Sequence, residues 1–218
     1  MRLARHLDTA DALAEILFGL IMVLTFTLAA GFVASEGAQG VREIMIAAIG
    51  CNLAWGIIDA AMYVMSSAMH RGRRRRFAAA IRAAPDEAAR LRVVAAELGD
   101  DLGEAATPAD REAFFRSILR IASHARAAPL RLTRSDWLGA WNCFYLVAGT
   151  TIPAILPFLV LRDDPFLALR VSNHLLALLL FAVGFTWARE TGLRPWRAAF
   201  VFLLASLALV YLAIALGG

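Results

Sequence analysis

Asp59 is a carboxylate in the middle of a long apolar run, which extends from about Ile44 to Met69. An ionisable group at the depth of a bilayer is costly, so such a residue is a candidate functional site. Helical spacing places Asn52 and Tyr63 on the same stripe as Asp59, with Met62 alongside. This stripe predicts a cation or proton site lined by Asp59, Asn52 and Met62. The alternative is a hydrogen-bond network that holds neighbouring helices together.

A second acidic residue, Glu15, lies near the start of another apolar run, at about Ala12–Ala34. It is either the first ligand of a transport path or a solvated acid at the membrane interface. Met22 follows on the same helical face. Its thioether, like that of Met62, suits a soft or borderline metal. Methionine also fills gaps in packed cores, which is the alternative for both residues.

A third apolar run contains residues that indicate a kinked helix. Asn142 precedes Gly149 and the prolines Pro153 and Pro157. Proline removes a backbone donor and clashes with the preceding turn, so the helix is expected to bend there. The bend either frees backbone carbonyls toward a cavity or serves packing alone.

Two charged clusters lie outside the apolar runs. One is acidic and is either a weak site for divalent cations or a solvated loop; it comprises Glu97, Asp100, Asp101 and Glu104. The other is basic, and we expect it to fix the membrane topology and contact anionic lipid headgroups rather than nucleic acid. It comprises Arg71, Arg73, Arg74, Arg75 and Arg76.

The sequence contains no motif that indicates an enzyme. There is no Ser-His-Asp set, HExxH, P-loop or GxGxxG. Cys51 and Cys143 both fall in apolar runs without CxxC spacing, so they are expected to be buried small residues. We expect no catalytic activity and no permanently bound cofactor.

The hydropathy of the chain predicts the helices that position these residues. The chain has 218 residues, of which 60% are hydrophobic, compared with about 45–50% in soluble domains. The excess lies in blocks of roughly 20 residues, the length that crosses a bilayer. Such segments must satisfy their own backbone hydrogen bonds, so they are helices. The predicted fold is an all-α polytopic membrane protein with five transmembrane helices, at about Ala12–Ala34, Ile44–Met69, Trp137–Leu161, Leu167–Trp187 and Trp196 to the C-terminus.

The predicted organisation has three parts: residues 1–69 with two transmembrane helices, a helical insertion at 70–136, and residues 137–218 with three more. Within the insertion, Pro85-Asp86-Glu87 and Thr107-Pro108 are typical helix starts. The arginine distribution predicts that the N-terminus and the insertion are cytoplasmic and the C-terminus is outside. The expected location is a bacterial-type inner membrane.

Short patches of the chain carry a family resemblance. Glu15 and Gly19 have a Glu–Gly spacing of four, Gly56 has Asn52 four residues before it, and the third run contains Gly149-Thr150-Thr151-Ile152-Pro153. In these patches, and in its five-helix layout with a cytosolic insertion, the chain resembles the vacuolar iron transporter family. The family's transport Asp of helix 1 falls at Met22, and its Ser of helix 2 falls at Asp59. The differences are those expected if a carboxylate had moved to the second helix and a thioether to the first.

The resemblance implies a homodimer that exchanges divalent metal cations, Fe²⁺ or Mn²⁺, for protons. The path would be lined by Asp59, Asn52, Met62, Met22 and Glu15. The alternative function is a non-transporting dimeric scaffold or sensor whose basic insertion contacts lipid or a partner.

Overall fold

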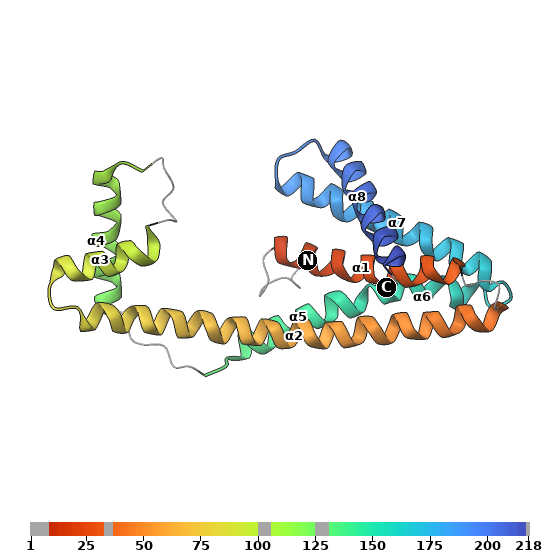
Figure 1. The fold of residues 1–218 in the computed structure, drawn as a ribbon, viewed down its shortest axis with the longest axis horizontal. Coiled ribbons are helices and arrows are strands. Elements are labelled where there is room, and N and C mark those ends of the chain that lie inside the picture. Colours follow the sequence, from red (N-terminus) through yellow and green to blue (C-terminus); the bar gives the residue numbers. More distant parts are fainter. Residues whose placement is uncertain (1–8, 33–36, 100–105, 125–130, 217–218) are drawn as a thin grey trace. The chain divides into compact units, whose positions relative to one another are not determined.

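The computed structural model describes residues 9–32, 37–99, 106–124 and 131–216, and all regular elements in those ranges are helices. The expected all-α class is therefore confirmed for this part of the chain. The helices are α1 (Thr9–Phe32), α2 (Gly37–Ala83), α3 (Glu87–Leu98), α4 (Pro108–His124), α5 (Arg134–Gly149), α6 (Thr151–Val160), α7 (Pro165–Glu190) and α8 (Pro195–Ala215) (Figure 1).

Several of these helices are of the kind that crosses membranes. By length and composition alone, five helical stretches in the described ranges are long and apolar enough to do so. A helix rises about 1.5 Å per residue, so about 20 residues cover the hydrocarbon core. The stretches are Thr9–Ala29, Gln39–Ala83, Arg134–Val160, Pro165–Glu190 and Pro195–Leu212.

The chain forms two compact units. The apolar unit consists of Met1–Val64 and Arg134–Gly218, and the basic unit is Met65–Thr133. Helix α2 contributes residues to both units. Its apolar run ends near Met69, yet the helix continues to Ala83 because arginine and alanine are strong helix formers.

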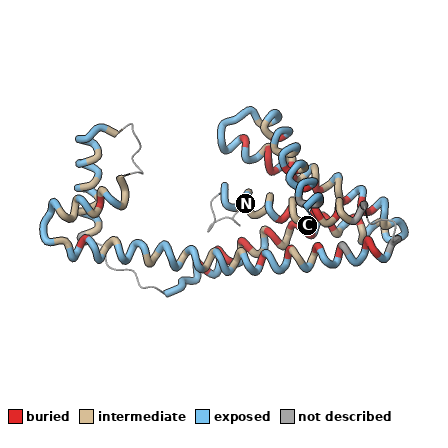
Figure 2. The backbone as a smooth tube through the Cα atoms, in the orientation of Figure 1, coloured by how far each residue is buried: buried red, intermediate tan, exposed pale blue. Residues whose placement is uncertain are grey.

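In the apolar unit, α1 packs against α5, α6, α7 and α8, and α7 also packs against α6 and α8. The buried positions lie on the faces these helices turn toward each other (Figure 2). Small residues permit this close approach, as is common in membrane bundles. A Cβ at Gly184 of α7 would lie 2.7 Å from Cβ of Phe202 in α8. The hydroxyl of Ser172 in α7 donates to the carbonyl of Ala154 in α6 over 2.9 Å.

The third apolar run is interrupted where the prolines predicted a bend. Helix α5 ends at Gly149 and α6 begins at Thr151, so Thr150 lies between them. Pro153 is in the first turn of α6 and cannot donate to a carbonyl in the last turn of α5. The break places the Thr150 side chain and the last carbonyls of α5 beside α1 and α2.

The basic unit is built around the second part of α2 and the pair α3 and α4, which pack against each other. Both expected helix starts are confirmed. The Asp86 side chain accepts a hydrogen bond from Ala89 N over 2.6 Å and caps α3. The Thr107 hydroxyl accepts one from Asp110 N over 3.2 Å at the start of α4.

Candidate functional site

Asn52 is fully buried where three helices of the apolar unit meet. Its amide nitrogen donates to the Thr150 hydroxyl over 2.9 Å and to the carbonyl of Gly19 over 3.2 Å. The carbonyl of Val147 lies 3.5 Å from the same nitrogen. The Thr150 hydroxyl donates to that Val147 carbonyl over 2.7 Å. Asn52 of α2 therefore joins α1 to the end of α5.

The orientation of the Asn52 amide follows from its neighbours. The carbonyls of Gly19 and Val147 can only accept, so the amide nitrogen must face them. The oxygen Oδ1 then points elsewhere, and it is buried without a partner among the described residues. A buried acceptor left unpaired costs about 1–3 kcal/mol. This carbonyl oxygen is therefore available to a proton donor or a cation.

Glu15 and Asp59 form a second polar centre in the same unit. The carboxyl group of Glu15 in α1 lies near enough to the carboxyl group of Asp59 in α2 and to the thiol of Cys143 in α5 to interact with both electrostatically. Two carboxylates at short range repel each other, so a proton or a cation near the pair is favoured. Asp59 Oδ2 is buried and has no partner among the described residues. The arrangement places two acidic side chains of different helices near each other within the apolar unit.

The two polar centres lie at different depths. Asn52 and Asp59 are seven residues apart on α2, which corresponds to about 10 Å along the helix axis. One ion cannot contact both side chains at once. The partners of these two residues are separated in a corresponding way, because Thr150, which directly follows α5, is seven residues beyond Cys143, and Gly19 is four beyond Glu15 on α1. The helices α1, α2 and α5 thus share a polar seam, defined here by Glu15, Asp59, Cys143, Gly19, Asn52 and Thr150.

Glycines bring the helices of the polar seam close together. A Cβ at Gly19 would lie 2.5 Å from the Thr150 hydroxyl oxygen. A Cβ at Gly56 would lie 3.1 Å from the carbonyl oxygen of Phe144, and one at Gly139 would lie 2.2 Å from the Tyr63 ring. Any larger residue at Gly19 or Gly139 would force the helices or side chains apart.

The sequence-predicted residues divide into those in the seam and those outside it. Asp59, Asn52 and Glu15 belong to the seam. Met22 contacts a different partner, because the Cys51 thiol lies 3.5 Å from its sulfur. Met62 is 58% exposed and does not join Asp59.

The other predicted site residues lie in the apolar unit, in the basic unit or outside the described residues. Tyr63 is half-buried against Gly139, and Asn142 is half-buried on α5. In the basic unit, Glu97 forms an ion pair of 2.5 Å with Arg73. Asp100, Asp101 and Glu104 lie outside the described residues.

Two members of the predicted arginine cluster bind other residues of the basic unit. The Arg71 guanidinium donates to the carbonyl of Arg131 over 2.9 Å and to the Thr133 hydroxyl over 3.3 Å. Arg73 pairs with Glu97. The remaining members, Arg74, Arg75 and Arg76, are exposed.

Two residues of the seam were not predicted to have a role. Cys143 was expected to be an inert buried residue, and Thr150 was noted only within the proline motif. Cys143 belongs to α5 and Thr150 directly follows it, and the register of α5 relative to Asn52 and Asp59 is set by tertiary packing. The seven-residue spacing from Cys143 to Thr150, equal to that from Asn52 to Asp59, is the signal that could have paired them.

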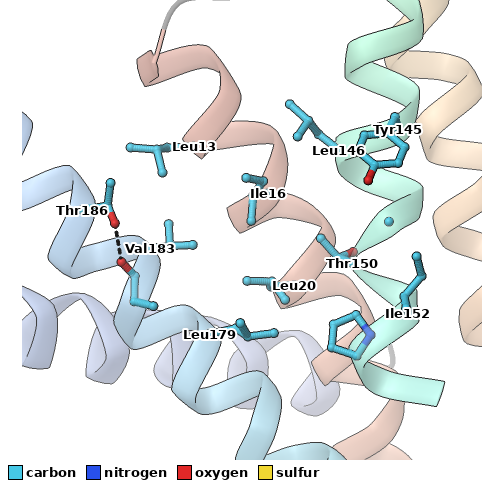
Figure 3. Close-up of a pocket in the computed structure, with 13 residues that line it drawn as sticks. Leu13, Ile16, Leu20, Tyr145, Leu146, Thr150, Ile152, Leu179, Val183 and Thr186 are labelled. Carbon is cyan, nitrogen blue, oxygen red and sulfur yellow. Dashed lines mark hydrogen bonds between the residues drawn. The ribbon is translucent and has the colours of Figure 1, made fainter. Parts of the chain in front are cut away.

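A separate cavity of about 390 Å³ lies between α1, the α5–α6 break and α7 (Figure 3). Its lining is mainly aliphatic, with hydroxyl groups from Tyr145, Thr150 and Thr186. The Thr186 hydroxyl donates to the carbonyl of Ala182 over 2.8 Å, within its own helix (Figure 3). The lining contains no carboxylate, so this cavity suits hydrocarbon and not a cation.

Among the described residues, no three His, Cys, Asp or Glu side chains gather closely enough to hold a metal ion. The seam therefore offers a pair of carboxyl groups rather than a closed cage. Comparison with known proteins finds no family model that matches the chain and no curated protein significantly similar to it.

Proposed function

We propose that this chain is an integral membrane transporter of divalent metal cations, with Fe²⁺ or Mn²⁺ as substrate, that exchanges them for protons. The observation that supports it is the electrostatic proximity of the carboxyl groups of Glu15 and Asp59. These groups lie on helices that are long and apolar enough to cross a bilayer. Carboxyl groups in such segments are rare and typical of ion and proton pathways.

The proposed exchange begins with a proton held near the two carboxyl groups. A divalent cation that arrives at the pair displaces this proton, because two carboxylates balance a double positive charge. Carboxylate oxygens and water are the ligands that Mn²⁺ prefers, so water completes the coordination that the two carboxylates begin. The unpaired oxygen of Asn52 provides a second station about 10 Å away along α2. Release of the cation restores the proton to the pair.

The proposed setting is a bacterial-type inner membrane. In it five helices span the bilayer, the N-terminus and the basic unit are cytoplasmic, and the C-terminus is outside, as the arginine distribution indicates. The protein acts as a homodimer, and the exposed arginines Arg74, Arg75 and Arg76 contact anionic lipid headgroups. Reporter fusions at the C-terminus and after Gly99 test the topology: only the C-terminal fusion should be active in a reporter that needs export.

The test of transport is Mn²⁺ uptake into proteoliposomes that contain a pH-sensitive dye. The Glu15→Gln and Asp59→Asn variants should take up Mn²⁺ and release protons no faster than protein-free liposomes. Glu43→Gln is the matched control, because Glu43 is exposed on α2 and bonds only to Gln39 among the described residues. Undiminished uptake in Glu15→Gln and Asp59→Asn would reject the role of the pair.

A non-transporting dimeric scaffold or sensor is the second candidate. The observation that favours it is the lack of a three-ligand metal group in the described part of the chain. On that view Glu15, Asp59 and Asn52 only hold the helices together. Wild-type proteoliposomes would then show no uptake of Mn²⁺ or Fe²⁺, while the Glu15→Gln and Asp59→Asn variants would lose thermal stability.

A further inference from the structure

Two sulfur atoms from different helices meet between α1 and α2 of the apolar unit. The Cys51 thiol of α2 donates a weak hydrogen bond to the Met22 sulfur of α1 over 3.5 Å. Both residues are half-buried, so neither is closed off in the packed core. Neither belongs to the polar seam, and the proposed exchange at the carboxyl pair does not use them. This sulfur pair, Met22 and Cys51, is therefore a second candidate site in the same unit.

Aromatic side chains flank the sulfur pair one helical turn away. Trp55 is four residues beyond Cys51 and Phe18 is four before Met22, so each ring shares a helical face with one sulfur. The two rings pack edge to face, with their centroids 5.5 Å apart. The Trp55 side chain also lies near enough to the Cys51 thiol to interact with it electrostatically. The ring contact therefore holds α1 and α2 in the register that brings the two sulfurs together.

The chemistry of the sulfur pair favours a soft cation with a single charge. Thiolate and thioether sulfurs are the ligands that select Cu⁺ over harder metal ions. One thiolate balances one positive charge, so a complex of Cu⁺ with the sulfur pair is neutral. A neutral complex is compatible with an apolar helix bundle. A divalent ion on the same two ligands would keep a positive charge, which is costly in such surroundings.

We propose that Met22 and Cys51 bind a soft monovalent metal cation of the class of Cu⁺ and Ag⁺. The cation displaces the thiol proton, which passes to water, and it forms one bond to the Cys51 thiolate and one to the Met22 thioether. No electron is transferred, so copper remains Cu⁺. The Trp55 ring adds cation–π attraction.

The sulfur pair must open slightly to admit the cation. Metal–sulfur bonds are about 2.3 Å long, so a linear complex would place the sulfurs about 1 Å further apart than the observed 3.5 Å. Methionine has three rotatable side-chain bonds, so the Met22 sulfur can supply this shift without movement of the helices. The site is distinct from the carboxyl pair, because Cys51 and Asp59 are eight residues, or about 12 Å, apart along α2.

The test is competition for Cu⁺, kept reduced by ascorbate, between the full chain in uncharged detergent and the coloured chelator bicinchoninate. The wild type should withdraw one Cu⁺ per chain. Met22→Leu should weaken this binding by about tenfold, because it removes one sulfur ligand. Cys51→Ser should weaken it by more than the roughly 10–100-fold that loss of a group behind a metal ligand costs. Met65→Leu is the matched control, since it makes the same change at an exposed methionine of α2, and it should leave binding unchanged. Equal binding by Met22→Leu and Met65→Leu, or no Cu⁺ withdrawn by the wild type, would overturn the proposal.

X-ray absorption at the copper edge separates the loss of a ligand from misfolding. The wild type should show two sulfur neighbours at about 2.3 Å. Met22→Leu conserves side-chain volume, so the fold should be kept while one sulfur neighbour disappears. Two sulfur neighbours in this variant would also overturn the proposal.

An excess of Mn²⁺ separates this site from the carboxyl pair. Mn²⁺ prefers oxygen ligands, so it should leave Cu⁺ bound to the wild type. Displacement of Cu⁺ by Mn²⁺ would place copper at the carboxyl pair and reject the sulfur site. Failure of Mn²⁺ uptake in proteoliposomes would reject the proposed transport and leave Cu⁺ binding by Met22 and Cys51 as expected.

Discussion

Replacement of Gly19 by alanine is expected to destabilise the apolar unit. The added Cβ would lie 2.5 Å from the Thr150 hydroxyl oxygen and 2.9 Å from the carbonyl oxygen of Val147. The Thr150 hydroxyl cannot turn away freely, because it donates to Val147 and accepts from Asn52. The Val147 carbonyl belongs to the backbone of α5. Relief of the clash therefore requires α1 and α5 to separate.

The size of the effect follows from three contributions. Overpacking of a close contact costs about 1–3 kcal/mol. Separation of α1 and α5 also weakens the hydrogen bond from Asn52 to the Gly19 carbonyl, and interhelical bonds in membranes are worth about 0.6 kcal/mol each. Alanine has a higher helix propensity than glycine by about 1 kcal/mol, which offsets part of the loss. The expected net destabilisation is about 1–2 kcal/mol.

The assay is reversible unfolding in mixed micelles with increasing dodecyl sulfate, followed by circular dichroism. Gly50→Ala is the matched control, because a Cβ at Gly50 of α2 meets nothing within 4 Å. The control should keep or raise stability. If Gly19→Ala were as stable as Gly50→Ala, the result would contradict the close contact between α1 and α5.

Three further substitutions test other contacts. Gly139→Ala should destabilise the apolar unit by about 1–3 kcal/mol, because the added Cβ would lie 2.2 Å from the Tyr63 ring. In the double variant with Tyr63→Ala the ring is absent, so this loss should be suppressed. Asp86→Ala should cost about 1 kcal/mol and speed hydrogen exchange in the first turn of α3 but not of α4. Thr107→Ala should speed hydrogen exchange in the first turn of α4 but not of α3. Equal changes of exchange in both helices would contradict the assignment of Asp86 and Thr107 as caps.

Much of the helical framework could be predicted from the sequence, because local chemistry determines it. Asp86 and Pro108 mark helix starts that depend on a few adjacent residues. The break at Thr150 follows from Pro153, whose missing N–H acts within one turn. The end of α2 could not be predicted from hydropathy, since that scale reports the preferred solvent of a side chain and not the conformation of its backbone.

The partners of each polar residue depend on helix register and could not be predicted in the same way. The sequence placed Asn52 and Asp59 on one stripe but did not separate them into two centres. Cys143 reaches Glu15 only because α5 packs beside α1 with a particular register. The sulfur pair has the same origin, because Met22 and Cys51 are 29 residues apart along the chain and meet only when α1 and α2 pack.

The close packing of the polar seam has a consequence for the proposed transport. At the level of Asn52, α1 approaches the end of α5 at Gly19 too closely to admit a larger side chain, and between this level and that of Asp59, α2 approaches α5 tightly at Gly56. A hydrated cation is larger than a methyl group, so it cannot pass this point while the three helices keep these contacts. If the proposed transport takes place, it requires α5 to move away from α1 and α2. The break at Thr150, between α5 and α6, is the point in this segment at which the proposed movement of α5 would be accommodated.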